Sequence, residues 1–74
     1  MQEALEVCEA LLQEDNCWEH AWQLMILIHL RQENRSQAMR TLARCTETLQ
    51  KELGVPPSGE TLALLVQGDP TLPR

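Results

Sequence analysis

Aromatic residues are nearly absent from this chain of 74 residues, which has no Phe, no Tyr and only two Trp. The residues that dominate instead, Leu, Ala, Glu and Gln, are good helix formers. Hydrophobic residues make up 43% of the chain, which is too much for a disordered segment. The composition therefore predicts an all-α fold, with a thin core because the chain is short.

The chain also lacks a long apolar run, and its first residues do not predict a secretory leader. No unbroken apolar stretch is longer than that of residues 24–28, which is far below the roughly 20 residues that a membrane span needs. The first residues, Met-Gln-Glu-Ala, have no basic and apolar character. The three cysteines are an odd number, whereas a small secreted scaffold would carry an even and denser set. We therefore expect a cytoplasmic protein that does not interact with membranes.

Basic residues are missing from the first twenty positions, which hold six acidic residues. Residues 31–51 hold five basic and two acidic residues, and the net charge is −5. The overall charge disfavours nucleic acid as a direct partner, and no aromatic side chains interleave with Arg31, Arg35, Arg40 and Arg44 for base stacking. The chain is expected to be electrically polar, which could order copies head to tail. The simpler interpretation is two solvated helix faces of opposite sign.

Features of an enzyme are scarce. There is no glycine-rich loop, and the two serines, Ser36 and Ser58, have the character of turn and cap residues. Glu6 and Glu9 share one solvated face without a nearby base. We therefore expect neither catalysis nor a cofactor, since perturbed catalytic groups need burial that this chain cannot supply.

A metal site is not expected either. Cys17-x-x-His20 has ligand-like spacing, but the other candidate ligands, Cys8, His29 and Cys45, fall on different predicted helices. Small apolar cysteines and a surface histidine explain these residues better. The alternative is a reactive thiol at Cys17, whose position near a helix N-terminus would lower its pKa.

Hydrophobic periodicity predicts the first two helices. In residues 2–14, apolar residues recur at steps of three and four. Asn16, followed three residues later by Glu19, is a capping-box pattern that predicts the start of a second helix. From residue 21 to residue 30, eight of ten residues are apolar, so we expect this helix in the middle of a three-layer stack.

A third helix is predicted over residues 35–53, with Asn34 and Gln37 as its cap. Its buried stripe is expected to contain Ala38, Leu42, Cys45 and Leu49, joined by Met39. Gly54 should end this helix in a left-handed conformation, and the prolines that follow forbid its continuation. Ser58 is a good N-cap for a short fourth helix through about residue 66. Residues 68–74 are interpreted as a flexible tail after a domain spanning residues 1–67.

The chain contains an internal repeat. An offset of 34 residues takes Ala4 to Ala38, Cys8 to Leu42 and Leu11 to Cys45. This period, with helix–turn–helix units, is typical of tetratricopeptide repeats, in which each hairpin covers a bare apolar face of the next. The segments 21–22, 32–35 and 38 also resemble one tetratricopeptide unit, so the predicted fold is a set of antiparallel helix hairpins.

A narrower resemblance lies in residues 48–61, Thr-Leu-Gln-Lys-Glu-Leu-Gly-Val-Pro-Pro-Ser-Gly-Glu-Thr, preceded by Leu24-Met25 and by Gln37-Ala38-Met39. This pattern resembles the C-terminal part of the bacterial transcriptional activator domain. The resemblance implies a regulator, often with a winged-helix DNA-binding domain on the N-terminal side and sometimes with a signalling ATPase.

The tetratricopeptide resemblance also implies a protein-binding groove on the second helix. Its lining residues would be His20, Gln23, Leu27, Leu30 and Arg31. Leu27 and Leu30 could anchor a partner helix or peptide, or a further helix of the same protein could cover them. The residues expected to serve structure are Trp22, Met25, Ala38, Leu42 and Gly54.

These observations favour a protein-interaction module of a bacterial transcriptional regulator, mediating dimerisation or signal relay. The alternative is a structural cap that ends a longer tetratricopeptide solenoid in a signalling or scaffold protein. The partner would be a second copy or another domain of the parent regulator. Since a bare apolar patch is expected, we predict self-association, preferably as a twofold dimer.

Overall fold

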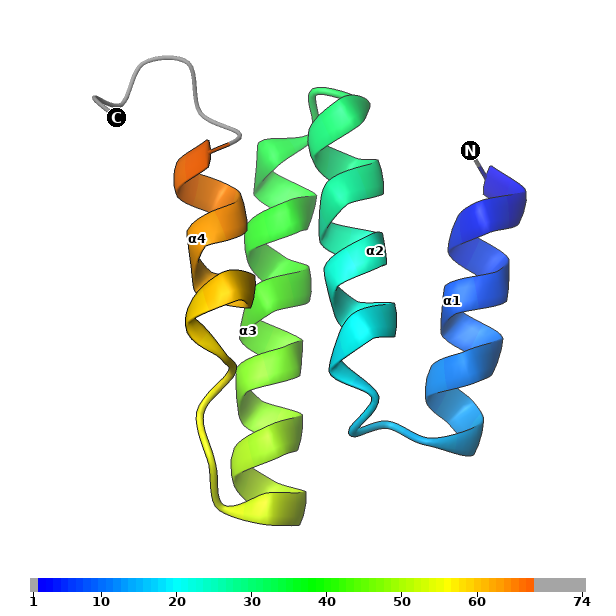
Figure 1. Cartoon of the computed structure of the whole chain (residues 1–74). Coiled ribbons are helices and arrows are strands. Elements are labelled where there is room, and N and C mark those ends of the chain that lie inside the picture. The colour runs from blue at the N-terminus through cyan, green and yellow to red at the C-terminus, as the bar shows by residue number, and fades with distance from the viewer. Residues whose placement is uncertain (1, 68–74) are drawn as a thin grey trace.

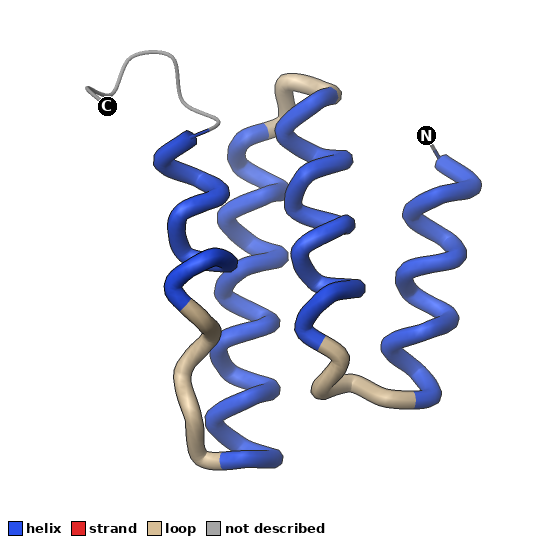
Figure 2. Tube along the Cα trace, viewed as in Figure 1, coloured by secondary structure: helices blue, strands red, loops and turns tan. Residues whose placement is uncertain are grey.

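The computed structural model describes residues 2–67, which form four α-helices and contain no strand. The helices are α1 (Gln2–Glu14), α2 (Glu19–Arg31), α3 (Arg35–Leu53) and α4 (Gly59–Gln67). They lie side by side in chain order, with α1 and α4 at opposite edges (Figure 1). Successive helices alternate in direction and are joined by turns and one longer loop (Figure 2). This is the predicted fold of antiparallel hairpins; the tail predicted for residues 68–74 lies outside the described residues.

Helix α2 is the central element, as its apolar sequence predicted. It contacts α1, α3 and α4, and it separates two buried clusters. The larger cluster joins α1, α2 and α3 through Cys8, Leu12, Ala21, Trp22, Met25, Cys45 and Leu49. The smaller one joins α2, α3 and α4 through Ile26, Ala38 and Leu65. Within residues 2–67 no helix has the length and apolar character needed to cross a membrane.

Both ends of α3 follow the predicted local rules. At the start, the Asn34 side chain accepts a hydrogen bond from the Gln37 amide at 3.3 Å. At the end, Gly54 adopts φ 69° and its amide donates to the Gln50 carbonyl at 3.0 Å. The turn before α3 contains a second left-handed residue, Glu33, at φ 59°. A side chain at such a φ is strained, so this turn is held by its surroundings.

The predicted start of α2 is wrong. The helix begins at Glu19 after Trp18, and Asn16 does not cap it. The Asp15 carboxylate instead accepts from the Cys17 amide at 3.0 Å, and the Asn16 carbonyl accepts from the Trp22 indole at 2.9 Å. These two hydrogen bonds engage the Asp15 side chain and the Asn16 carbonyl with residues close to them in sequence, Cys17 and Trp22. A capping box is also impossible because the Glu19 carboxylate is bound to a distant loop.

Met39 is a second correction, because its side chain is 54% exposed and does not belong to the buried stripe of α3. Thr41, which is fully buried, takes a place in that stripe. Its hydroxyl is satisfied by donating to the Gln37 carbonyl at 2.9 Å. Periodicity allowed Met39 as a neighbour of Ala38, but the face that α3 buries runs through positions 38, 41, 45 and 49.

Candidate protein-interaction site

Four side chains on α2 form an exposed stripe, which we call the α2 stripe: His20, Leu24, Leu27 and Arg31. They lie on one side of the helix because 3.6 residues make a turn. Trp22, on the opposite side, is buried and contacts the Arg44 guanidinium of α3. Leu24 and Leu27 are 39% and 37% exposed. The stripe is therefore an apolar centre with a polar residue at each end.

The structure divides the predicted groove residues into two sets. His20, Leu27 and Arg31 lie in the α2 stripe, whereas Gln23 and Leu30 face α4. The Gln23 amide donates to the Thr61 hydroxyl at 2.8 Å. Leu30 packs against the small cluster that includes Leu65 of α4. A further helix of the same chain thus contacts part of the predicted groove, and protein binding by these five residues stays a prediction.

Leu24 is the stripe residue that the sequence reasoning did not include. The signal was present, because Leu24 follows His20 by four residues and precedes Leu27 by three. Residues 24–28 are all apolar, however, so the sequence does not indicate which of them face the uncovered side of the helix.

Glu19 holds α4 against α2, beside the α2 stripe. One oxygen of its carboxylate accepts from the Ser58 amide at 2.8 Å, from the Ser58 hydroxyl at 2.5 Å, and from the Thr61 hydroxyl. Ser58 is also the predicted N-cap of α4, since its hydroxyl accepts from the Thr61 amide at 3.4 Å. Partial burial raises the pKa of Glu19, but the hydrogen bonds outweigh it and the net pKa is lowered.

This network gives a physical role to the Ser-Gly-Glu-Thr end of residues 48–61. Its serine and threonine bind a carboxylate about 40 residues earlier in the chain, as sequence separations of 39 and 42 show. The motif and the Ser58 cap are evident from the sequence alone, whereas their partner Glu19 is not.

The residues expected to serve structure occupy different environments. Trp22 and Met25 are each 3% exposed in the larger cluster, and Ala38 is fully buried in the smaller one. Leu42 is half-buried and packs against the smaller cluster. Gly54 caps α3, and a β-carbon there would meet no atom within 4 Å.

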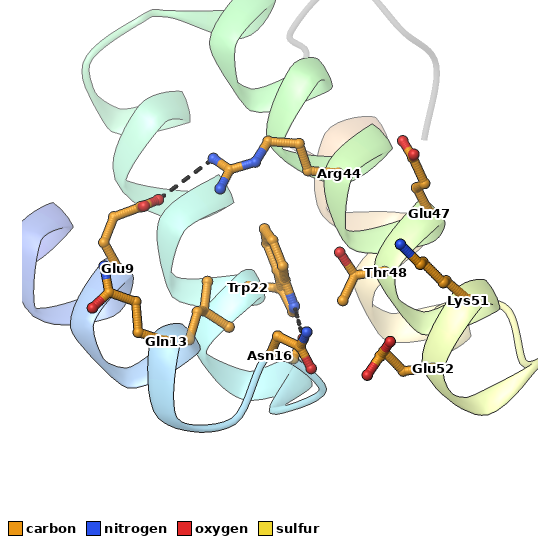
Figure 3. A pocket seen from close by; sticks show the side chains of 10 residues that line it. Glu9, Gln13, Asn16, Trp22, Arg44, Glu47, Thr48, Lys51 and Glu52 are labelled. Carbon is orange, nitrogen blue, oxygen red and sulfur yellow. Dashed lines mark hydrogen bonds and ion pairs between the residues drawn. The ribbon is translucent and has the colours of Figure 1, made fainter.

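Glu9 of α1 and Arg44 of α3 face each other across a cleft of about 420 Å³, whose α3 side also carries Glu47, Lys51 and Glu52 (Figure 3). Arg44 lies 3.4 Å from Glu9 and stacks over the Trp22 ring at 5.4 Å. The ion pair is half-exposed and contributes at most about 1 kcal/mol. The predicted charge polarity is thus partly neutralised within the domain.

The cysteines have raised thiol pKa values, which disfavours the reactive-thiol alternative. The pKa of Cys17 is raised by desolvation and by the carboxylates of Asp15 and Glu52. These effects act opposite to the lowering expected near a helix N-terminus. Burial likewise raises the pKa of Cys45 to about 11. In residues 2–67 no three His, Cys, Asp or Glu side chains are placed to hold a metal ion.

Comparison with protein families matches residues 1–67 to the bacterial transcriptional activator domain. Comparisons with curated proteins and with solved structures find no match. The family match covers all four helices, including the Gly54 cap and the Ser58–Thr61 network. The family is one of transcriptional regulation. The chain therefore belongs to the bacterial transcriptional activator domain family.

Proposed function

We propose that this domain is a protein-interaction module of a cytoplasmic bacterial transcriptional regulator, in which it mediates dimerisation or relays a signal and catalyses no reaction. The observation that carries the proposal is the α2 stripe. Two partly exposed leucines stand between His20 and Arg31 on a helix that three other helices hold in place. A rigid helix with this pattern suits recognition of another protein surface.

The chemistry of the stripe favours a partner helix or peptide with an apolar anchor. Leu24 and Leu27 would contact that anchor, while Arg31 and His20 would make polar contacts at the rim. His20 is partly oriented by Trp18, whose ring stacks on it with the centroids 6.4 Å apart.

Two observations favour a protein partner over nucleic acid. Of the four arginines in residues 31–44, Arg35 donates to the Leu65 carbonyl at 3.0 Å and Arg44 contacts Glu9. These side chains already serve contacts within the domain. The net charge of −5 also opposes binding to phosphates.

The alternative of a terminal cap in a longer solenoid is less well supported. A capping repeat needs a polar outer face. The outer side of α3 and α4 instead carries an apolar groove lined by Met39, Leu42, Pro56 and Leu65.

The test is a chromosomal Leu27→Glu substitution, with Arg31→Glu as a second variant because Arg31 is exposed. We expect both to reproduce the transcript changes caused by deleting the domain, at unchanged protein level. Leu53→Glu is the matched control, since Leu53 is 59% exposed and lies outside the stripe. Wild-type transcript levels in both stripe variants, where deletion alters them, would contradict the proposal.

A further inference from the structure

An apolar groove of about 530 Å³ runs along the outer side of α3 and α4. Its lining includes Met39, Leu42, Ala43, Thr46, Pro56 and Leu65. Met39 is 54% exposed although it is a large apolar side chain. The groove is separate from the α2 stripe, which lies on a different helix.

The internal repeat shows what kind of surface this groove is. Subtracting 34 from the positions of Met39, Leu42, Thr46 and Pro56 gives Leu5, Cys8, Leu12 and Trp22. Cys8, Leu12 and Trp22 are core residues, and they share their buried cluster with Cys45 and Leu49 of α3. Leu5 packs against the same cluster.

Part of the surface of α1 and α2 that receives α3 therefore recurs 34 residues later, on α3 and on the loop that precedes α4. Leu65, the groove residue on α4, corresponds instead to Arg31 of the α2 stripe. In the first repeat α3 lies over this surface and Cys8, Leu12 and Trp22 are buried, although the cleft between α1 and α3 remains beside Leu12 and Trp22. In the second repeat no helix within residues 2–67 covers the equivalent surface, which remains an open groove. By this equivalence the groove is a binding site for a helix that resembles α3.

Helix α1 is the repeat equivalent of α3, and it has a spare apolar face. The residues that α3 buries at positions 38, 41 and 45 correspond to Ala4, Val7 and Leu11, whereas its fourth buried residue, Leu49, corresponds to Asp15 just after α1. Ala4 is exposed, Val7 is 58% exposed and Leu11 is half-buried. Cys8 and Leu12, on the neighbouring face, already bind α2. Leu11 also packs against the larger cluster. Helix α1 can thus keep its own packing and offer Ala4, Val7 and the exposed part of Leu11 to another surface.

Charge does not select the partner, because the charged residue that lines the groove is Glu47 and α1 itself carries four glutamates. Steric fit supports the contact at one position. Within one chain Glu9 of α1 meets Arg44 of α3. The repeat equivalent of Glu9 is Ala43 and that of Arg44 is Ala10, so the contact between copies would place Ala43 opposite Ala10 of the other copy. Two alanines permit close approach of the helices.

We propose that α1 of a second copy docks into the groove between α3 and α4, so that copies associate head to tail. Each copy offers one α1 face and one groove, which makes the contact heterologous and open to extension. The predicted twofold dimer, if formed through the bare faces of two α1 helices, would bring their glutamates together and cost electrostatic energy.

The experiment uses two single variants of the whole chain and their mixture. Val7→Glu blocks the α1 face but keeps the groove, and Met39→Glu blocks the groove but keeps the α1 face. Both side chains are more than half exposed, so neither substitution disturbs the core. Leu53→Glu, at a position outside both surfaces, is the control.

Sedimentation equilibrium provides the readout. We expect the average mass of the wild-type chain and of Leu53→Glu to rise with concentration past the mass of two chains. Each variant alone should associate about tenfold more weakly or worse, because docking would bury a charge. An equimolar mixture of the two variants should recover one intact contact and form a discrete one-to-one complex that does not extend.

Three results would overturn the inference. They are a wild-type chain that stays monomeric to about 1 mM, a Met39→Glu variant that associates like the wild type, and a mixture of the two variants that remains monomeric. The second result, together with loss of association in Val7→Glu, would indicate a twofold contact through α1. None of these results affects the α2 stripe, whose role is tested separately by the transcript measurement.

Discussion

Replacing Glu19 by Gln should loosen α4 and lower the stability of the whole domain. The substitution keeps the size of the side chain but removes the charge that three donors on Ser58 and Thr61 share. Hydrogen bonds to a charged group contribute about 1.5–3 kcal/mol, against about 0.5–1.5 kcal/mol for neutral pairs. Because the donors share one oxygen of a half-buried side chain, we expect a total loss of about 1–2 kcal/mol.

Chemical denaturation followed by tryptophan fluorescence and by circular dichroism at pH 7 measures this loss. In a domain of this size each kcal/mol also lowers Tm by about 4–8 °C. Glu6→Gln is the matched control, since Glu6 is exposed on α1, and its effect should stay within about 0.5 kcal/mol.

The pH dependence gives a second readout with a definite sign. The pKa of Glu19 is lowered in the folded state, so its contribution is fully present above the ordinary glutamate value of 4.5. The contribution is lost as the pH falls through the folded pKa. The stability difference between the wild type and Glu19→Gln should therefore shrink on acidification. An unchanged denaturation midpoint at pH 7, or a difference that persists in acid, would refute the role assigned to this carboxylate.

Three further predictions concern single positions. Gly54→Val should cost about 1–2 kcal/mol through backbone strain at φ 69°, and an unchanged denaturation midpoint would show that the left-handed cap is unimportant. Glu33→Gly should raise the free energy of unfolding by about 0.5 kcal/mol, since it relieves strain at φ 59° at some entropic cost; a lower midpoint would contradict this. Iodoacetamide at pH 8 should modify Cys17 slowly and spare Cys45 in the native protein, because Cys45 is fully buried and its pKa is about 11. Equal labelling of the two cysteines by mass spectrometry would contradict that assignment.

The parts of the fold that depend on neighbouring residues were predictable from the sequence. The limits of α1 and α3, the Asn34 cap and the left-handed Gly54 follow from periodicity and local hydrogen bonding. The start of α2 was not predictable in this way, because Glu19 is bound to Ser58 across 39 residues. A capping-box pattern predicts only hydrogen bonds between residues close in sequence. Here the Glu19 carboxylate instead binds Ser58, which is far away in the sequence.

The candidate site was predicted in part for a related reason. Helix α2 is apolar on nearly every side, so its sequence does not distinguish the side that faces α4 from the side that faces solvent. The sequence predicts Leu30, but not Leu24, as a groove residue, whereas Leu30 packs toward α4 and Leu24 lies in the α2 stripe. The placement of α4, held by Glu19 and by Arg35, decides between them.

Site-specific photo-crosslinking in living cells tests most directly whether the α2 stripe binds protein. A photoreactive amino acid replaces Leu27 in one strain and Leu53 in a control strain, since both leucines are partly exposed and only Leu27 belongs to the stripe. We predict that position 27 forms a discrete adduct with a second regulator subunit or with a component of the transcription machinery, and that position 53 does not. The same adduct pattern at both positions, or no adduct at position 27, would contradict the assignment of the stripe as a protein-binding surface.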